Sequence, residues 1–462
     1  MYRCYIMSIK SIKKEKYQQA LQVSQENKQL YGEIFTPFSL IDIMFDMMES
    51  SYFSDPSKTY LDAGAGSGFF SMCLYWRLMD GLQNAIPDME ARSTHIITKM
   101  IYMIEIREEN VVKLRAMFGE GCNVSGGNFL EYLSRKFDYI IGNPPYNCNG
   151  IKKVPTNSIK NKKQDGKTIW FHFVKHSIEL LEPGGKILFI VPSIWMKPGR
   201  DNSYEFMTSY KIDKLRCMSN SLTNKYFSGE AQTPTSLILM SKLQSDGLIS
   251  LYDQDLDRYI DYSFDSKSLE PIPVYGCSVF SKVKRDIKTQ GLIVHKTNMP
   301  SSKATISKTK DKEHSYENIR TCIVSGLNPK LVIEYSNMEL AFSGKKKMVM
   351  AHKMYGFPFV DKIGKYGISN RDSYVIESNN IDYLERLAQF FSTKTALYLF
   401  EATRYRMKYL EKYVFQIIPD ICKLKEFPNE ITDKSIAAYF GFTDEEINAI
   451  NKLHSKNYTF TY

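Results

Sequence analysis

The tetrapeptide Asn143-Pro144-Pro145-Tyr146 has the residue types to act on an amino group. It follows the apolar run Phe137–Ile141 after one glycine, which places it at the end of a predicted buried strand. The side-chain oxygen of Asn143 and the backbone carbonyl of Pro144 are hydrogen-bond acceptors, and the two prolines stiffen the turn without adding donors. Two fixed acceptors could draw the delocalised lone pair of an aromatic amine back onto nitrogen, while Tyr146 stacks on the ring. An ordinary proline turn that closes a strand is the structural alternative.

A glycine-rich loop, Asp62-Ala63-Gly64-Ala65-Gly66-Ser67-Gly68, ends the first predicted strand and opens a helix. Its glycines let the backbone turn tightly and approach a ligand at the carboxyl edge of a sheet. A dinucleotide site is the rival interpretation, because its fingerprint also begins a strand-turn-helix unit. Here Asp62 directly precedes the first glycine, and the spacing does not extend to the dinucleotide pattern. The loop therefore favours an adenosyl ligand without a pyrophosphate.

Polar residues also end the next two predicted strands. Glu105 is placed to accept hydrogen bonds from both ribose hydroxyls, and Asn128 is placed to meet an adenine edge. The cofactor residues predicted in this part of the chain are Asp62, Ala63, Gly64, Gly66, Gly68, Glu105, Ile106, Asn128 and Phe129.

Composition sets the broad class of the protein. With 462 residues, 43% hydrophobic and 24% charged, the chain has the composition of a soluble globular protein and the length of two domains. We expect an intracellular protein, since no apolar run approaches the roughly 20 residues of a membrane span and no signal-peptide core is present. The eight cysteines are scattered, so we expect neither a disulfide framework nor a metal site.

The net charge of +10 fits a polyanionic partner, because lysine and arginine neutralise phosphates. Lysines crowd the loop that follows the tetrapeptide, and cations mix with aromatic residues around Lys345-Lys346-Lys347 and on a predicted helix over 404–409. A solvated charged surface is the alternative. The candidate nucleic-acid contacts are Lys152, Lys153, Lys162, Lys163, Lys346, Lys353, Tyr355, Arg404 and Arg406.

Alternating apolar runs and helical stretches in the first half predict a parallel sheet with covering helices. The clearest helix is Phe171–Leu181, which Pro183-Gly184-Gly185 ends. Near the C-terminus, Thr443 and Glu446 predict a capping box. The predicted strands are Thr59–Ala63, Met100–Glu105, Asn123–Ser125, Phe137–Ile141, Lys186–Val191, Lys214–Met218 and Thr235–Ser241.

In chain order these motifs resemble those of the S-adenosylmethionine-dependent DNA methyltransferases that modify the N6 amino group of adenine. The order is Gly32–Pro37, the glycine loop, Glu105, Asn128-Phe129 and Asn143–Tyr146. It resembles the gamma arrangement of type II restriction-modification and phage or viral adenine methylases. The resemblance covers residues about 30–245, and extends more weakly over Lys345–Phe427, including Tyr355-Gly356-Phe357-Pro358.

The resemblance implies a Rossmann-like methyltransferase domain with a mostly parallel seven-stranded sheet, and a C-terminal mixed α+β target-recognition domain. We expect an N-terminal extension (1–28), the catalytic domain (29–245), a linker (246–275) that contains Pro271-Ile272-Pro273, the recognition domain (276–430) and a helical segment (431–462). It also implies S-adenosylmethionine as cofactor with no metal, double-stranded DNA as partner, and the bacterial cytoplasm or an infected host cell as location.

The same resemblance suggests roles for residues outside the glycine loop. Phe35, Thr36 and Pro37 would help to enclose the methionine part of the cofactor. The family usually has Asp where Asn128 stands, and an amide oxygen can accept the same hydrogen bond without charge. Phe227 is the candidate to hold the second face of a flipped base, with Tyr226 and Phe206 as rivals.

The expected reaction rotates one adenine out of the duplex and displaces the methyl group directly onto its amino nitrogen. Methylation of N4 of cytosine is an alternative, although that branch more often has Ser at the position of Asn143. RNA and protein-glutamine methyltransferases share the tetrapeptide but are usually shorter. A fused nuclease and a catalytically silent DNA-binding module fit less well. A separate restriction endonuclease is a candidate partner, and no motif indicates the recognised base sequence or the oligomeric state.

Overall fold

The computed structural model describes residues 8–9, 35–119, 121–148, 167–227, 233–267, 269–284, 291–325, 328–351, 357–371, 373–405 and 412–452. The chain separates into two compact units. Residues 1–195 and 199–250 form the first unit, and residues 196–198 and 251–462 form the second.

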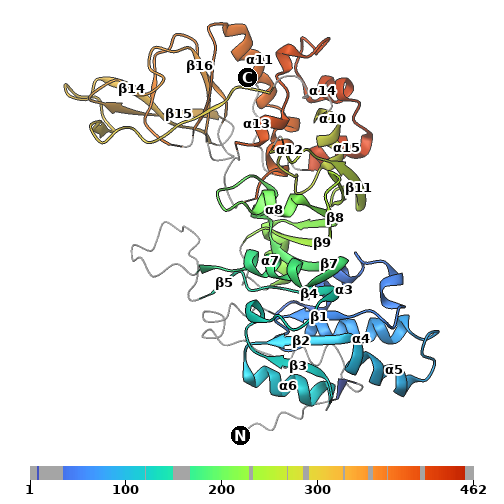
Figure 1. The fold of residues 1–462 in the computed structure, drawn as a ribbon. Coiled ribbons are helices and arrows are strands. Elements are labelled where there is room, and N and C mark those ends of the chain that lie inside the picture. The colour runs from blue at the N-terminus through green and yellow to red at the C-terminus, as the bar shows by residue number, and fades with distance from the viewer. Residues whose placement is uncertain are drawn as a thin grey trace. The chain divides into compact units, whose positions relative to one another are not determined.

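An α/β arrangement organises the first unit, in which helices alternate with the strands of a mixed sheet (Figure 1). Seven strands run in the order β3-β2-β1-β4-β7-β9-β8. The pairs among β3, β2, β1, β4 and β7 are parallel, whereas β9 is antiparallel to both β7 and β8. The strands are β1 (Tyr60–Ala63), β2 (Ile101–Glu105), β3 (Asn123–Gly126), β4 (Phe137–Gly142), β7 (Leu181–Pro192), β8 (Tyr210–Met218) and β9 (Thr235–Gln244).

Each of the seven strands predicted from the sequence is present in this sheet, which also carries β10 (Leu248–Asp253) and β11 (Arg258–Ser263) at one end. The sheet therefore has nine strands rather than the expected seven. The two extra strands lie within residues 246–275, where the sequence predicts a linker. β11 is an edge strand in which only Tyr262 is buried, so its signal is weak, whereas β10 has four of its six residues buried and is an apolar strand, although the sequence predicts a linker there.

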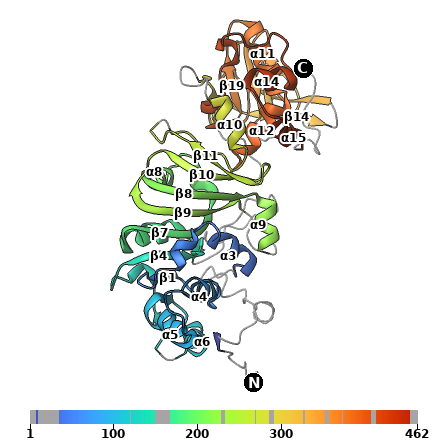
Figure 2. The same ribbon diagram turned by 90° about the vertical axis from the view of Figure 1, so that its right-hand side faces the viewer.

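The helix predicted over Phe171–Leu181 is α7 (Trp170–Leu180), and β7 begins at the next residue. Ahead of the sheet, α3 (Phe38–Phe45) packs against α4 (Phe69–Gly81) and β7, and Figure 2 shows it beside the sheet. The other helices of this unit are η2 (Ser50–Phe53), α5 (Met89–His95), η3 (Ile96–Met100), α6 (Glu108–Phe118), η4 (Phe129–Glu131), α8 (Ser203–Ser209) and α9 (Asn220–Tyr226); η5 (Ser193–Met196) ends at the unit boundary.

The register of the parallel strands brings the chemically interesting residues to one edge of the sheet. Asp62 in β1 lies beside Ile141 in β4, so the glycine loop and the tetrapeptide leave adjacent strands at neighbouring points. Glu105 in β2 pairs with Gly126 in β3 at the same carboxyl edge. Loops at this edge of an open α/β sheet are the usual place for a ligand.

Two four-stranded sheets lie in the second unit, in the orders β12-β19-β16-β17 and β13-β15-β14-β18, and β11 of the nine-stranded sheet also falls within its residue range. The long hairpin of β14 and β15 dominates the second sheet and is antiparallel, with one register shift. The strands are β12 (His295–Lys296), β13 (Ile306–Ser307), β14 (Tyr316–Ser325), β15 (Asn328–Ser336), β16 (Lys347–Met350), β17 (Phe359–Asp361), β18 (Gly367–Ile368) and β19 (Tyr374–Glu377).

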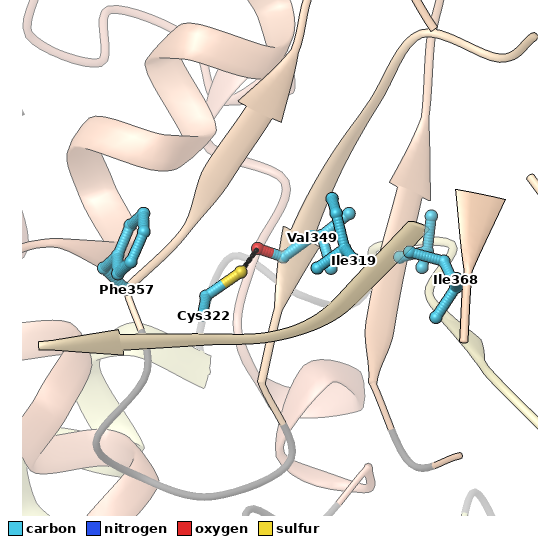
Figure 3. Close-up of a cluster of buried hydrophobic side chains, with 6 residues drawn as sticks. Ile319, Cys322, Val349, Phe357 and Ile368 are labelled. Atoms are coloured by element: carbon cyan, nitrogen blue, oxygen red, sulfur yellow. Dashed lines mark hydrogen bonds between the residues drawn. The ribbon is translucent and has the colours of Figure 1, made fainter. Parts of the chain in front are cut away.

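A small apolar cluster joins these two sheets (Figure 3). Ile319 and Cys322 of β14 are fully buried against Val349 of β16, and the Cys322 thiol lies 3.9 Å from the Val349 carbonyl oxygen. Ile368 of β18 completes the contact from the neighbouring strand. Burial raises the pKa of the Cys322 thiol to about 12, so this sulfur acts as a small apolar group rather than a nucleophile.

Helices complete the second unit, which makes it a mixed α+β structure. The predicted capping box is confirmed: the Thr443 amide donates to Glu446 at 2.7 Å, and the Glu446 amide donates to the Thr443 hydroxyl at 3.3 Å. The helices are α10 (Cys277–Lys284), α11 (Ile381–Phe391), α12 (Lys394–Ala402), α13 (Val414–Ile417), η6 (Ile421–Lys423), α14 (Asp433–Phe440) and α15 (Asp444–Lys452).

The described residues contain neither a membrane-spanning helix nor a cluster of metal-ligating side chains. None of the helices there combines the length and the apolar character needed to cross a membrane. No group of three or more His, Cys, Asp or Glu side chains in the same residues is arranged to hold a metal ion.

Candidate active site

The glycine loop turns sharply because its backbone adopts conformations that favour glycine. Gly64 and Gly68 have φ of +87° and +84°. A Cβ on Gly68 would lie 2.8 Å from a methyl carbon of Leu114, so close packing also requires glycine there. The amide of Gly64 donates to the Ile104 carbonyl at 3.1 Å, which fastens the loop to β2. The next turn begins α4 directly at Phe69.

Asp62 is buried at the end of β1 with half of its carboxylate satisfied. Its Oδ2 accepts hydrogen bonds from the Ser71 hydroxyl at 2.7 Å and the Ser71 amide at 3.2 Å. Its Oδ1 is also buried, and no hydrogen-bond partner for it exists among the described residues. Burial raises the pKa of Asp62 to about 7; the Ser71 hydrogen bonds oppose that rise, and the charge of Glu105 adds to it. An unpartnered buried oxygen of this kind fits a ligand that carries a donor.

Glu105 fixes the glycine loop from the neighbouring strand. Its Oε2 accepts the Gly66 amide at 2.7 Å and its Oε1 accepts the Arg107 amide at 2.9 Å. These two hydrogen bonds orient the carboxylate at the carboxyl edge of the sheet, and a carboxylate oxygen can accept more than one donor. The next residue, Ile106, is 53% exposed, which leaves an apolar surface beside the acid. This pair could hold a ribose and one face of its base.

Asn128 and Phe129 have partners within the protein. The Asn128 Oδ1 caps η4 by accepting the Leu130 amide at 3.1 Å, and its amide nitrogen donates to Glu131 at 2.9 Å. The Phe129 ring is 3% exposed and stacks on Phe173 of α7, with ring centres 4.9 Å apart. These contacts give both residues a structural role, and the cofactor role of Asn128 stays a prediction that would use its second lone pair.

The tetrapeptide begins where β4 and β1 come closest. Gly142 has a φ of +146°, and a Cβ there would lie 3.3 Å from the Ala63 carbonyl oxygen and 3.7 Å from Oδ1 of Asp62. Only glycine fits this position without displacing the loop. The unpartnered oxygen of Asp62 therefore lies next to the residue that precedes Asn143. The glycine loop and the tetrapeptide are neighbours in space as well as in the sheet register.

The side chain of Asn143 is held at one end. Its Nδ2 donates to the hydroxyl of Thr36 at 3.0 Å, whereas its Oδ1 is buried without a partner among the described residues. The acceptor that the sequence assigns to an incoming amine is thus the atom with spare hydrogen-bonding capacity. This hydrogen bond joins residues 107 positions apart, and no local sequence pattern predicts it.

Tyr146 is anchored through its backbone. Its carbonyl accepts the Ile169 amide at 3.1 Å, and the ribbon of β5 (Asn147–Cys148) and β6 (Lys167–Thr168) continues this pairing. The Tyr146 hydroxyl is buried, and it too lacks a partner in the described chain. Burial raises its pKa well above the ordinary value, so the ring stays neutral. A neutral ring with a fixed backbone suits stacking.

The segment Phe35–Pro37 lies against the start of α4. Phe35 stacks on Phe69 with ring centres 5.4 Å apart and an angle of 28° between the rings. Pro37 precedes α3 in an extended conformation. Gly32 to Ile34 of the same predicted motif lie outside the described residues.

The candidates for the second aromatic face have different environments. Phe227 directly follows α9 and is 4% exposed, and its amide donates to the Thr223 carbonyl at 3.0 Å. Phe206 of α8 packs edge-on against Phe171, with ring centres 5.4 Å apart. Tyr226 is half-buried. None of these contacts assigns a base-binding role, so Phe227 stays a prediction.

Several of the predicted nucleic-acid contacts fall outside the described residues: Lys152, Lys153, Lys162, Lys163, Lys353, Tyr355 and Arg406. Lys346 is exposed. Arg404 forms an ion pair with Glu401 at 3.1 Å, and it follows the end of α12 rather than lying on the helix that the sequence predicts. The neighbouring Tyr405 is only 2% exposed, so its ring belongs to the core.

The sequence suggests a cationic surface at Lys345-Lys346-Lys347. In the structure only the first two of these lysines are exposed. The Lys347 side chain is fully buried, and its ammonium lies 2.7 Å from Oδ2 of Asp361 in β17. Burial lowers the pKa of Lys347, and the adjacent Asp361 opposes that shift. A buried lysine that is already paired makes no phosphate contact, so this residue is structural.

The region of this chain that matches a known protein family includes the tetrapeptide. Residues 81–221 match the model of the Eco57I restriction-modification methylase family. The type II methyltransferase M.PaeR7I of Pseudomonas aeruginosa is 26% identical over 190 residues, which cover 36% of this chain and 32% of that protein. An uncharacterised adenine-specific methylase of Mycoplasma pneumoniae is 24% identical across 36% of this chain and 56% of its own length. The chain therefore spans about a third of the length of the first of these relatives.

Among solved structures, that of the Type IIL restriction-modification enzyme MmeI in complex with DNA aligns with 93% of this chain and 76% of that one. The identity is 12% and the TM-score is 0.49. The family match runs from the end of α4 through β8 and includes Glu105, Asn128 and the tetrapeptide. Residues 81–221 are thus similar to an Eco57I restriction-modification methylase.

Proposed function

We propose that this protein is an S-adenosylmethionine-dependent methyltransferase that modifies N6 of an adenine flipped out of double-stranded DNA. The observation that carries the proposal is the state of Asn143. Its Oδ1 is buried and has no partner among the described residues, and Asn143 directly follows Gly142, which packs against Ala63 and Asp62 at the glycine loop; a substrate amine would supply the missing donor. The match of residues 81–221 to a restriction-modification methylase family, and an adenine-specific methylase among the relatives, support the same conclusion.

The residues around the glycine loop fit the proposed cofactor. Asp62 offers a buried oxygen with no partner among the described residues, which suits the ammonium of a methionine moiety. The carboxylate of Glu105 would accept the ribose hydroxyls, and the exposed Ile106 offers a face for the adenine. The cofactor supplies an electrophilic methyl group when it is bound.

The chain contributes position and electrostatics to the transfer. Asn143 Oδ1 and the Pro144 carbonyl would each accept one amino hydrogen, which returns electron density to the nitrogen as positive charge develops there. Tyr146, neutral and fixed by its backbone, would stack on the purine. Phe227 is the proposed second face. No covalent intermediate is needed, because transfer between two bound reactants gains most of its rate from orientation.

Double-stranded DNA is the proposed partner. The net charge of +10 supports a polyanionic ligand, and Lys346 is exposed and available for a phosphate contact. The lysines between β5 and β6, together with Lys353, Tyr355 and Arg406, are further proposed contacts. A separate restriction endonuclease is a proposed partner in the cell, where the protein would work in the cytoplasm.

The test is methyl transfer from labelled S-adenosylmethionine to duplex DNA by the purified protein, followed by mass analysis of the nucleosides. We expect N6-methyladenine from the native protein and none from Asn143→Ala. Label in N4-methylcytosine would point to the alternative base. Label confined to RNA or to a protein glutamine, with none in DNA, would refute the proposal.

A further inference from the structure

We infer that Thr36 is a positioning residue for the reaction: its hydroxyl fixes the plane of the Asn143 amide so that Oδ1 faces the substrate amine. This inference rests on the proposed function, and it gives Thr36 a task beyond enclosing the cofactor. The two residues are 107 positions apart in the chain, yet Nδ2 of Asn143 lies 3.0 Å from the Thr36 hydroxyl oxygen.

Burial makes this hydrogen bond consequential. Thr36 is 4% exposed, so water does not replace its hydroxyl as a partner for the amide. The opposite end of the Asn143 side chain, Oδ1, has no partner among the described residues. The Thr36 bond is therefore the contact that holds an otherwise rotatable amide. A terminal amide torsion is soft by itself, which makes such an external constraint necessary.

The hydroxyl sets which amide orientations are compatible with catalysis. A substrate amine brings only donors to this point, so the atom that faces it must be an acceptor. With Nδ2 occupied by Thr36, Oδ1 faces the substrate. If the amide turned by 180°, Nδ2 would meet the incoming N–H groups and two donors would face each other. The Thr36 hydroxyl accepts the hydrogen bond from Nδ2, which leaves Oδ1 for the substrate.

Thr36 is itself well anchored. On one side Phe35 stacks on Phe69, and on the other Phe38 lies 4.6 Å from the same ring, measured between ring centres. Phe69 begins α4 immediately after Gly68 of the glycine loop. Residues 35–38 thus connect α4, which follows the glycine loop, to the side-chain amide of Asn143. Rigid support of this kind is what keeps a reactive geometry within the narrow tolerance that transfer requires.

Thr36→Val tests the inference, because valine keeps the shape of threonine and removes the hydroxyl. Thr36→Ser restores the hydroxyl, and Ser39→Ala, on the exposed face of α3, is the matched control. Single-turnover methyl transfer, kcat, KM for DNA and the dissociation constant for S-adenosylmethionine are measured for each variant. Exchange of the Asn143 side-chain amide hydrogens is followed by NMR in the ligand-free protein, with the signal assigned from the spectrum of Asn143→Ala.

We expect Thr36→Val to slow single-turnover transfer by about tenfold to a hundredfold, as for a buried donor left without its partner. KM for DNA stays unchanged, any loss of cofactor affinity is much smaller than the loss of rate, the Asn143 amide hydrogens exchange faster, and serine recovers most of the rate. An unchanged rate in the valine variant overturns the inference. So does a loss of cofactor affinity that accounts for the whole effect, or a serine variant as slow as valine.

The amide exchange separates this inference from the proposed function. If the native protein methylates no nucleic acid, the proposed function fails, and unchanged exchange in Thr36→Val then overturns the Thr36 assignment as well. Faster exchange in that case supports the positioning contact on its own terms.

Discussion

Two places in the molecule bury polar side chains on neighbouring strands, and they treat those side chains in opposite ways. At the carboxyl edge of β1 and β4, Asp62 and Asn143 each keep one buried oxygen without a partner in the described chain. Between β16 and β17, Lys347 and Asp361 are almost fully buried, and they make four hydrogen bonds with each other and with backbone groups. Buried polar atoms that are satisfied hold a structure together, and those left open are placed for something that binds.

The satisfied pair shows how a lysine comes to lie inside a sheet. All four residues of β16 are buried, so a lysine there is tolerated only because Asp361 lies directly opposite in the register. Asp361 also accepts the amides of Lys365 and Tyr366, both at 2.9 Å, and so closes the turn after β17. At the candidate active site, one oxygen each of Asp62 and Asn143 has no partner among the described residues. We propose that the bound ligands supply the donors for these two oxygens.

Breaking the satisfied pair should have the largest effect on stability. Lys347→Ala leaves Asp361 buried without its counterion, and we expect a loss of about 3–5 kcal/mol in the free energy of unfolding. Urea denaturation measures it. Lys345→Ala is the control, since its ion pair with Glu377 is largely exposed and should contribute at most about 1 kcal/mol. Equal losses in both variants would contradict the distinction between the two lysines.

Removing the open acceptor should instead spare stability and abolish function. In Asn143→Ala we expect kcat to fall by about two to three orders of magnitude, the size of effect found when a group aimed at the transition state is deleted. Cofactor affinity should stay near the native value, and the free energy of unfolding should fall by only about 1 kcal/mol, the contribution of the single hydrogen bond to Thr36, because Oδ1 has no partner among the described residues. A variant that unfolds readily while turning over normally would reverse the assignment of this site.

Asp62 offers a test through pH. Its pKa of about 7 lies above the ordinary 3.8, so the buried carboxyl is protonated below neutrality and the folded state loses stability as pH rises through that range. A cationic cofactor prefers the ionised form, and its affinity should therefore increase as pH rises toward 7 and level off above. Asp62→Asn should flatten both profiles, as measured by calorimetric titration and thermal unfolding. A cofactor affinity that weakens with rising pH in the native protein would be incompatible.

The smallest effect is expected at the Tyr146 hydroxyl, which is buried, has no partner among the described residues and is not assigned a ligand. Tyr146→Phe should be nearly neutral for stability and turnover, since the ring is what stacks. Tyr146→Ala should weaken base binding by about 1–3 kcal/mol, the contribution of one aromatic–base contact. Fluorescence of 2-aminopurine at the target position measures base binding in each of the two variants. If the phenylalanine variant is as impaired as alanine, the hydroxyl belongs with the functional oxygens.

The seven predicted strands were located in the sheet, because runs such as Phe137–Ile141 are apolar, buried on both faces and flanked by turn residues. Other buried strands, such as β10 and β16, were not predicted. Edge strand β11 was missed as well, and Tyr262 is its one buried residue. Lys347 was misassigned to the surface because a charge run in the sequence does not reveal the aspartate that register places opposite it.

At the candidate site, the chemical groups were predictable and their mutual support was not. The tetrapeptide and the glycine loop stand out locally, since both depend on residue types at short spacing. The hydrogen bond between Thr36 and Asn143 joins segments that are 107 positions apart in the chain. No pattern of residues within either segment predicts that they meet. Asn128 shows the reverse case: a polar residue at the expected position is engaged in capping its own turn.

The β5–β6 ribbon has a practical consequence for protein engineering. It pairs Asn147 with Thr168, and the adjoining Tyr146 carbonyl accepts the Ile169 amide, so both ends of the intervening stretch are fastened next to the tetrapeptide. The same stretch carries four of the proposed DNA contacts, Lys152, Lys153, Lys162 and Lys163, so a module is better inserted there than exchanged for it. An inserted targeting module would then have two fixed attachment points beside the tetrapeptide.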